Sequence, residues 1–228
     1  MINMAAAILF AASSSSSSSS STPEPVTFPT SDGGVLVGDL YGTGERGLVL
    51  AHGGRFDKES WAKQAKAFAA SGFRVLAFDF RGYGKSRGPG QADPMSAPLE
   101  RDVLAAVRYL REAGARPVAI VGGSMGGSAG ADAAALSDPG TIEAVVLIGS
   151  GGGRSPEKIP GRKLVIATKD DADGSGTLRL PKIRASYEKM TKPKEILILD
   201  GSAHAQDIFG TPEGERVMRE IIRFLSPS

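Results

Sequence analysis

The chain has 228 residues, a length that fits one domain with a single large core. Its 27 Lys and Arg nearly balance its 25 Asp and Glu, and no basic run occurs, so the sequence lacks the electrostatic footprint of a nucleic-acid-binding protein. Cysteine is absent and only two histidines occur, which excludes disulfides, thiolate zinc sites, iron–sulfur clusters and cysteine nucleophiles. Any chemistry that needs a neutral base must therefore use His52 or His204.

The first 25 residues predict a segment that takes no part in the fold. An apolar, uncharged stretch runs into nine consecutive serines, Ser13–Ser21, which have nothing to pack a core with. Residues 5–12 have the length of the apolar region of a signal peptide, but the first basic residue is Arg46, so the basic region that should precede it is missing. We expect residues 1–25 to be a disordered leader.

The role of that leader stays open between a flexible tail and a targeting segment. The protein is expected to be cytoplasmic in the first case, and organelle-targeted or secreted if the segment is a processed leader. No other apolar run approaches the roughly 18 residues that span a bilayer, so we expect a soluble protein with no membrane span.

From Val26 onward short apolar strands alternate with amphipathic helices, which predicts one α/β domain, residues 26–228, with a mostly parallel sheet and helices on both faces. The expected strands are residues 26–28, 35–41, 47–51, 73–78, 117–121, 142–148, 163–167 and 195–199, the first two forming a hairpin. The expected helices are residues 61–69, 99–110 and 217–225, with another directly after strand 117–121. Only 14 residues, mostly Gly, Ser and Pro, separate Ile148 from Lys163, too few for a helical cap domain.

Strand 117–121 runs directly into Gly122-Gly-Ser-Met-Gly126, which has the G-x-S-x-G spacing of a nucleophile elbow. A strained strand-to-helix turn brings backbone from both sides together, so the positions two before and two after the serine must lack a Cβ. The same spacing surrounds Ser86 and Ser128. Ser124 alone follows a buried strand without a gap and opens a helix, whose positive end would stabilise a developing oxyanion. A Gly-rich packing turn is the structural alternative.

A serine hydroxyl becomes an effective nucleophile when a histidine takes its proton and a carboxylate orients that histidine. His204 lies five residues past strand 195–199, at the carboxyl edge where α/β sheets gather their sites. His52 ends an earlier strand and is followed by two glycines, a position that suits an oxyanion loop better than a base. The sequence therefore favours His204 as the base, with a solvated surface histidine as the alternative.

Three aspartates, Asp170, Asp171 and Asp173, follow strand 163–167 and compete for the role of the orienting carboxylate. We favour Asp170, because it lies nearest the end of the strand and is expected to be held best. Asp171 and Asp173 are expected to be solvated loop carboxylates or turn formers. The sequence leaves the choice among the three open.

The ordered set of motifs resembles the α/β-hydrolase superfamily over roughly Val26 to the C-terminus. The matching segments are His52-Gly-Gly54, Asp79–Ser86 (D-x-R-G-x-G-x-S), Gly122–Gly126, Ala167–Asp170 (G-x-x-D, with Ala167 in place of the usual Gly) and Gly201–His204. The resemblance implies that Ser124 is the nucleophile, Asp170 the acid and His204 the base. It also implies that the backbone N–H groups of Gly54 and Met125 form the oxyanion hole, and it implies no metal and no organic cofactor.

A serine at the nucleophile position sets the chain apart from the dehalogenases and epoxide hydrolases of the superfamily, which use an aspartate. The short length and missing cap resemble the compact carboxylesterases and thioesterases. The resemblance therefore implies a serine hydrolase that cleaves carboxylic esters, with a small-molecule ester or acyl substrate, through an acyl-enzyme on Ser124. A thioesterase or peptidase, and a non-catalytic binding protein of this fold, are the alternatives. The oligomeric state stays open.

Without a cap domain, the cleft is expected to be shallow and open, bordered by the loops at residues 55–60, 81–97 and 149–161. Each loop carries one arginine of interest, namely Arg55, Arg87 and Arg154. These arginines favour an anionic substrate if they face the cleft, and are ordinary solvated residues if they do not.

Overall fold

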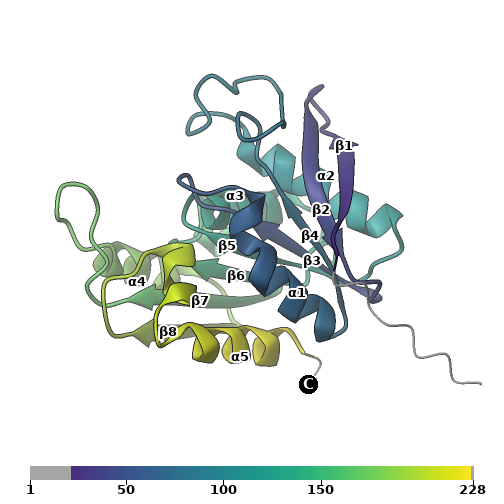
Figure 1. Ribbon diagram of the computed structural model, residues 1–228. Helices are drawn as coiled ribbons and strands as arrows, with labels where there is room; N and C mark the ends of the chain where they lie inside the picture. Colours follow the sequence, from purple (N-terminus) through teal and green to yellow (C-terminus); the bar gives the residue numbers. More distant parts are fainter. Residues whose placement is uncertain (1–21, 227–228) are drawn as a thin grey trace, which may run out of the picture.

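Eight strands form one sheet, in the order β1-β2-β4-β3-β5-β6-β7-β8, in the computed structural model, which describes residues 22–226 (Figure 1). The strands are β1 (Glu24–Pro29), β2 (Val35–Tyr41), β3 (Arg46–Ala51), β4 (Phe73–Phe78), β5 (Val118–Gly123), β6 (Ala144–Ile148), β7 (Arg162–Thr168) and β8 (Lys194–Leu199). The β1–β2 and β2–β4 pairs are antiparallel, and the other pairs are parallel. The predicted mostly parallel sheet is confirmed.

Five α-helices and three short 3-10 turns occur among the described residues. They are η1 (Lys58–Trp61), α1 (Ala62–Ala70), α2 (Leu99–Glu112), α3 (Met125–Leu136), η2 (Pro156–Lys158), α4 (Leu180–Lys189), η3 (Ala205–Gly210) and α5 (Gly214–Leu225). Across residues 22–226, none of these helices is long and apolar enough to cross a membrane.

The helices cover both faces of the sheet and bury one apolar cluster on each. α1 and α5 lie on one face, where Phe68 of α1 and Val217 and Ile221 of α5 are fully buried (Figure 1). α2, α3 and α4 contribute to the cluster on the other face. Because the central strands are covered on both sides, β5 and β6 are buried along their whole length, as their unbroken apolar sequences predict.

The N-terminal boundary of the folded part lies slightly earlier than expected. β1 begins at Glu24, whose backbone pairs with Leu40 of β2, so the strand starts two residues before Val26. The greater part of the predicted leader, residues 1–21, lies outside the described residues.

α4 is the helix that the sequence does not predict. It packs against β7 and η2, and Ile183 is its one buried side chain. With a single fully buried position in ten residues, the segment lacks the apolar stripe by which an amphipathic helix is recognised. The stretch between β6 and β7 carries only η2, which agrees with the prediction that no cap domain is inserted there.

Candidate active site

Ser124 occupies a sharp turn between the end of β5 and the start of α3. Its backbone has φ 50 and ψ −111, a strained conformation for a residue with a side chain, and its N–H is held by the carbonyl of Ile148 at 2.8 Å. A Cβ on Gly122 would lie 2.5 Å from the carbonyl oxygen of Gly126, and one on Gly126 would lie 2.3 Å from that of Ala51. The expected steric reason for both glycines is thereby confirmed.

The hydroxyl groups of Ser86 and Ser128, the other two serines with G-x-S-x-G spacing, make hydrogen-bond contacts within the fold. Ser86 is fully buried, and its Oγ accepts a hydrogen bond from the backbone N–H of Val37 at 2.9 Å. Ser128 lies one turn inside α3, with its Oγ 3.1 Å from that of Ser150. Ser124 is thus the serine of the three that the fold places at a strand-to-helix turn.

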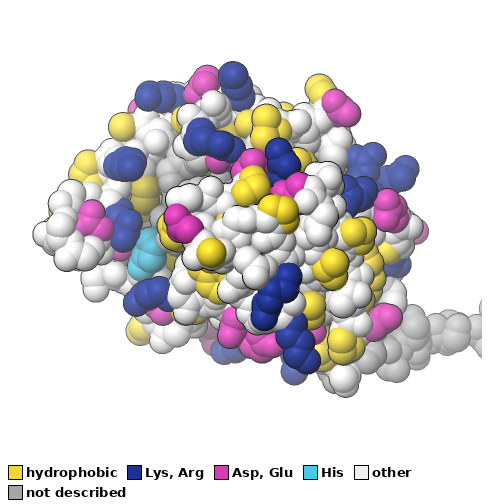
Figure 2. Space-filling view, turned by 90° about the horizontal axis from the view of Figure 1, so that it is seen from above, with side chains coloured by type: hydrophobic (Ala, Val, Ile, Leu, Met, Phe, Trp, Pro, Cys, Tyr) yellow, Lys and Arg dark blue, Asp and Glu magenta, His cyan; other side chains and the backbone are white. Residues whose placement is uncertain are grey.

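His204 lies beside Ser124, as the sequence predicts. It precedes η3 in the segment after β8, and its Nε2 is 2.8 Å from the Oγ of Ser124. The imidazole packs against Gly149 at the end of β6, where a Cβ would approach the ring to 3.1 Å. His52 is fully buried. Figure 2 shows histidine at the surface of the molecule, with Lys and Arg side chains near it.

The carboxylate that contacts His204 belongs to Asp171, and the choice of Asp170 is therefore wrong. The Oδ2 of Asp171 is 2.6 Å from the Nδ1 of His204, and Asp171 is only 2% exposed. Asp170 is exposed, and its backbone N–H donates to the carbonyl of Gly201. The residue nearest the strand end thus turns outward, and its neighbour points into the site. Asp173 accepts hydrogen bonds within its own turn, from Ser175 and Thr177.

Arg179 lies against the other oxygen of Asp171. Its Nε is 3.3 Å from Oδ1, and its backbone N–H donates to the carbonyl of Asp171, which closes the loop between these two residues. Sequence reasoning overlooked Arg179 because it lies at the start of the unpredicted helix α4.

His52 is fully buried and both of its ring nitrogens are engaged. Nε2 accepts a hydrogen bond from the backbone N–H of Phe80 at 3.2 Å, and Nδ1 lies 2.9 Å from the carbonyl of Gly53. Burial lowers the pKa of His52, which favours the neutral ring. No ring nitrogen is left to accept a proton from Ser124, so His52 holds the Gly53-Gly54 loop in place and His204 is the available base.

Gly54 and Met125, the expected oxyanion-hole residues, line a small pocket of about 180 Å³ together with Ser124 and His204. Met125 is the first residue of α3, so its backbone N–H has no acceptor within the helix. The side chain of Tyr83 reaches the same place, with its hydroxyl donating to the carbonyl of Gly54 at 3.0 Å. The arrangement is consistent with an anion-accepting position, whose use stays a prediction.

Gln206 joins the His204 loop to the Gly53-Gly54 loop. Its Oε1 accepts the N–H of Gly53 at 2.9 Å, and its Nε2 donates to the Oγ of Ser60 at 2.8 Å. The carboxamide occupies space that a side chain on Gly123 would fill, since a Cβ there would lie 2.5 Å from Oε1. Gln206 is buried, two residues after the histidine. Its part in the site has no signature in the sequence.

A larger pocket of about 710 Å³ opens beside Ser124. Two of the three predicted loops border it, through Met95–Ala97 and Gly149–Arg154, and the third lines the smaller pocket through Arg55 and Phe56. The start of α4 and the loop before it form an additional wall, which the sequence did not predict.

Arg154 lines the larger pocket, Arg55 lines the smaller one and Arg87 lines neither, and all three arginines contact other groups of the protein. Arg55 pairs with Asp207 at 2.8 Å, and Arg154 pairs with Asp132 at 3.0 Å and with Glu100 at 3.3 Å. Arg87 donates to the backbone carbonyls of Gly84 and Ser86. Within residues 22–226, no cluster of three His, Asp or Glu side chains is placed to hold a metal ion.

Three comparisons with known proteins bear on this arrangement. A family model described as alpha/beta hydrolase fold matches residues 48–188. A 2-hydroxy-6-oxononadienedioate/2-hydroxy-6-oxononatrienedioate hydrolase of Burkholderia vietnamiensis is 32% identical over 177 residues, which are 75% of this chain and 56% of that protein. The chain spans about half the length of the curated relatives it matches.

Two solved structures share the fold at low identity. An esterase of Pyrococcus furiosus has a TM-score of 0.75 at 18% identity, over 90% of this chain and 93% of that one. A dienelactone hydrolase of Anabaena variabilis has a TM-score of 0.70 at 20% identity, over 89% of this chain and 97% of that one. At these identities the likeness concerns the arrangement of strands and helices.

Proposed function

This chain belongs to the alpha/beta hydrolase family, and from that premise we propose that it is a serine hydrolase that cleaves carboxylic esters through an acyl-enzyme on Ser124. One observation carries the proposal: Ser124, His204 and Asp171 form a continuous hydrogen-bonded chain, with distances of 2.8 Å and 2.6 Å. They come from the segments after β5, β8 and β7, at the carboxyl ends of parallel strands of the same sheet.

In the first half-reaction, the Oγ of Ser124 attacks the ester carbonyl carbon while Nε2 of His204 accepts the serine proton. Asp171 accepts a hydrogen bond from Nδ1–H, which keeps Nε2 free for that proton and stabilises the imidazolium that forms. The tetrahedral intermediate then collapses, the ester C–O bond breaks, and His204 returns the proton to the leaving alcohol.

In the second half-reaction, water gives a proton to His204 and attacks the acyl carbon. Collapse breaks the bond to Ser124, which regains its proton from His204, and the carboxylic acid leaves. In both halves the negative charge on the carbonyl oxygen develops beside the N-terminus of α3. The backbone N–H groups of Met125 and Gly54 are the proposed donors to that oxygen.

The choice of a small-molecule substrate is supported by the chain's own pocket, which has about 710 Å³ beside the serine and both apolar and polar lining residues. The name of the Burkholderia vietnamiensis relative contains a dioate, and this name describes the substrate of that relative. The same relay of residues is suited to thioesters and amides, so the leaving group is a separate question.

The proposal is tested by the hydrolysis of p-nitrophenyl butyrate by the full chain, compared with Ser124→Ala and Ser128→Ala. Ser128 provides a matched control because it has the same glycine spacing and lines the same pocket. We expect Ser124→Ala to lose at least about a thousandfold in kcat and Ser128→Ala to keep most of the activity. Full turnover by Ser124→Ala would overturn the mechanism. Absence of turnover by the native chain on esters, thioesters and amides alike would favour a binding protein.

A further inference from the structure

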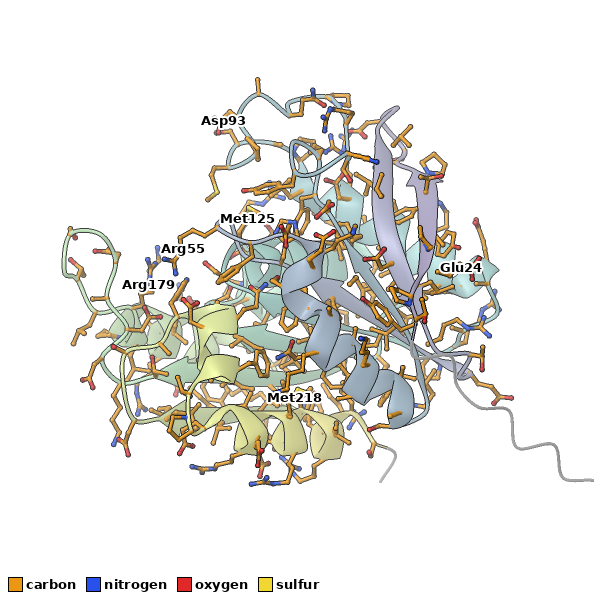
Figure 3. All side chains as sticks on the ribbon, viewed as in Figure 1. Glu24, Arg55, Asp93, Met125, Arg179 and Met218 are labelled. Carbon is orange, nitrogen blue, oxygen red and sulfur yellow. The ribbon has the colours of Figure 1, made fainter. Side chains whose placement is uncertain are left out.

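Arg179 stands where the two pockets of the site meet. Met95, Ser124, Met125 and Arg179 are the residues that line both the pocket of about 710 Å³ and the pocket of about 180 Å³. Figure 3 shows Arg179, Arg55 and Met125 gathered at the same edge of the molecule. A substrate whose carbonyl carbon lies at Ser124 therefore comes close to the guanidinium group of Arg179.

The guanidinium group is oriented by Asp171 but keeps free donors. Its Nε faces Oδ1 of Asp171 at 3.3 Å, and across residues 22–226 its other nitrogens make no side-chain or backbone hydrogen bond. The side chain is 38% exposed, so these nitrogens are available from the pocket. A guanidinium presents five N–H donors, enough to face one carboxylate of the protein and a second one from a ligand.

Lys182 adds a second cation on the same wall. It lies three residues after Arg179, in the first turn of α4, and lines the larger pocket. Residues three apart lie on the same side of a helix, and the positive N-terminal end of α4 adds to their field. In the described part of the chain no carboxylate pairs with Lys182.

The other charged side chains that line this pocket make ion pairs or hydrogen bonds with groups of the protein itself. Arg154 is shared between Asp132 and Glu100, and the carboxylate of Asp173 accepts hydrogen bonds from its own turn. Within the described residues, the N–H donors of this pocket that make no hydrogen bond to the protein thus include the outer nitrogens of Arg179 and the ammonium group of Lys182.

We propose that Arg179 and Lys182 bind a carboxylate on the acyl chain of the substrate, so that half-esters of dicarboxylic acids are the preferred substrate class. This inference rests on the proposed function, in which Ser124 attacks the ester. The acyl chain stays on Ser124 through both half-reactions and must occupy a pocket that Ser124 lines. The larger pocket is lined by Ser124 and by both cations.

Two p-nitrophenyl esters of equal chain length test the proposal: the monoester of glutarate, which carries a carboxylate, and the ester of valerate, which does not. The native chain is expected to have the higher kcat/KM for the glutarate monoester. Arg179→Gln and Lys182→Gln are each expected to lower the ratio of the two kcat/KM values by roughly tenfold, the usual effect of losing a hydrogen bond to a charged group. The loss should appear mainly in KM.

Arg184→Gln is the matched control, because Arg184 is exposed on the same helix and lines neither pocket. It makes the same change in charge and should leave the ratio unchanged. The control separates recognition of the substrate's carboxylate from the general electrostatic effect of removing one positive charge from α4.

A preference for valerate in the native chain, or an equal loss on both esters in Arg179→Gln and Lys182→Gln, would overturn the proposal and leave Arg179 as a positioning residue for Asp171. Either result differs from failure of the proposed function, in which the native chain hydrolyses neither ester or Ser124→Ala hydrolyses both.

Discussion

The carboxylate of Asp171 accepts a hydrogen bond from His204, with 2.6 Å between Oδ2 and Nδ1, whereas Asp170 is exposed at the surface. The backbone decides between the two neighbours. After β7 the chain continues to pair with the end of β8 and the residues that follow it, through hydrogen bonds from Lys169 N–H to the carbonyl of Leu199 and from Asp170 N–H to that of Gly201. This pairing leaves the side chain of Asp170 in solvent, and the next residue enters the site.

Replacement of Asp171 by Asn is expected to lower kcat by about 10³ to 10⁴, because an amide at this position favours the wrong tautomer of His204. Asp170→Asn makes the same chemical change one residue earlier, and it should leave kcat within about twofold of the native value because the side chain is exposed. Steady-state hydrolysis of an ester by the two variants measures the difference. The reverse pattern would return the acid role to Asp170.

Gln206 is expected to act on the rate through the Gly53-Gly54 loop. Gln206→Ala removes the acceptor of the Gly53 N–H, so kcat should fall by roughly tenfold as the proposed oxyanion donor of Gly54 loses its fixed position. Gln206→Glu keeps an oxygen at this place, and the hydroxyl of Ser60 can donate to it, so this variant should recover most of the rate. An equal loss in both variants would contradict a positioning role for the oxygen.

A methyl group on Gly126 is expected to destabilise the fold. In Gly126→Ala the new Cβ would lie 2.3 Å from the backbone oxygen of Ala51, so β3 and α3 must move apart, at a cost of about 1 to 3 kcal/mol. Gly174→Ala is the control, since nothing lies within 4 Å of a Cβ there. Urea unfolding of both variants gives the two free energies, and equal values would contradict the close approach at the elbow.

The buried His52 predicts a loss of stability in mildly acidic solution. Burial lowers the pKa of His52 in the folded chain below the value of 6.5 of a free histidine, so in mild acid the unfolded chain binds a proton at His52 that the folded chain does not bind. The contribution of neutral His52 to the free energy of unfolding is therefore complete above pH 6.5 and is lost as the pH falls from there towards the folded-state value.

Urea unfolding of the native chain, His52→Gln and His204→Gln at several pH values measures this contribution. The native chain and His204→Gln should lose stability together as the solution is acidified, whereas His52→Gln should be less stable and depend less on pH. A native-like pH dependence in His52→Gln would show that another group is responsible.

The parts of the fold that local sequence patterns encode were predictable. Unbroken apolar runs gave the central strands, because β5 and β6 are covered on both faces. The need for glycine on both sides of Ser124 was also predictable, because a side chain there would clash with the backbone of the turn itself or of the adjacent strand. Only two histidines were available, and the structure engages both nitrogens of His52 in the loop. The base could therefore be assigned by elimination.

The remaining features depend on contacts between distant segments. The direction of Asp170 and Asp171 follows from pairing with a loop about 30 residues away, for which two adjacent aspartates give no signal. α4 has one buried side chain, so its sequence lacks the apolar stripe that indicates a helix. Because the helix was not predicted, Arg179 at its start was not predicted as a site residue either. Gln206 acts through a hydrogen bond to Gly53, across more than half of the chain.

The central claim, that Ser124 is a nucleophile activated by His204, is tested most directly by covalent labelling with a fluorophosphonate and intact-protein mass spectrometry. If this claim holds, one adduct per native chain is expected, located on Ser124 by peptide mapping, with no labelling of Ser124→Ala and much slower labelling of His204→Gln. Labelling of Ser124→Ala at the native rate, or a native chain that stays unlabelled while folded, would contradict it.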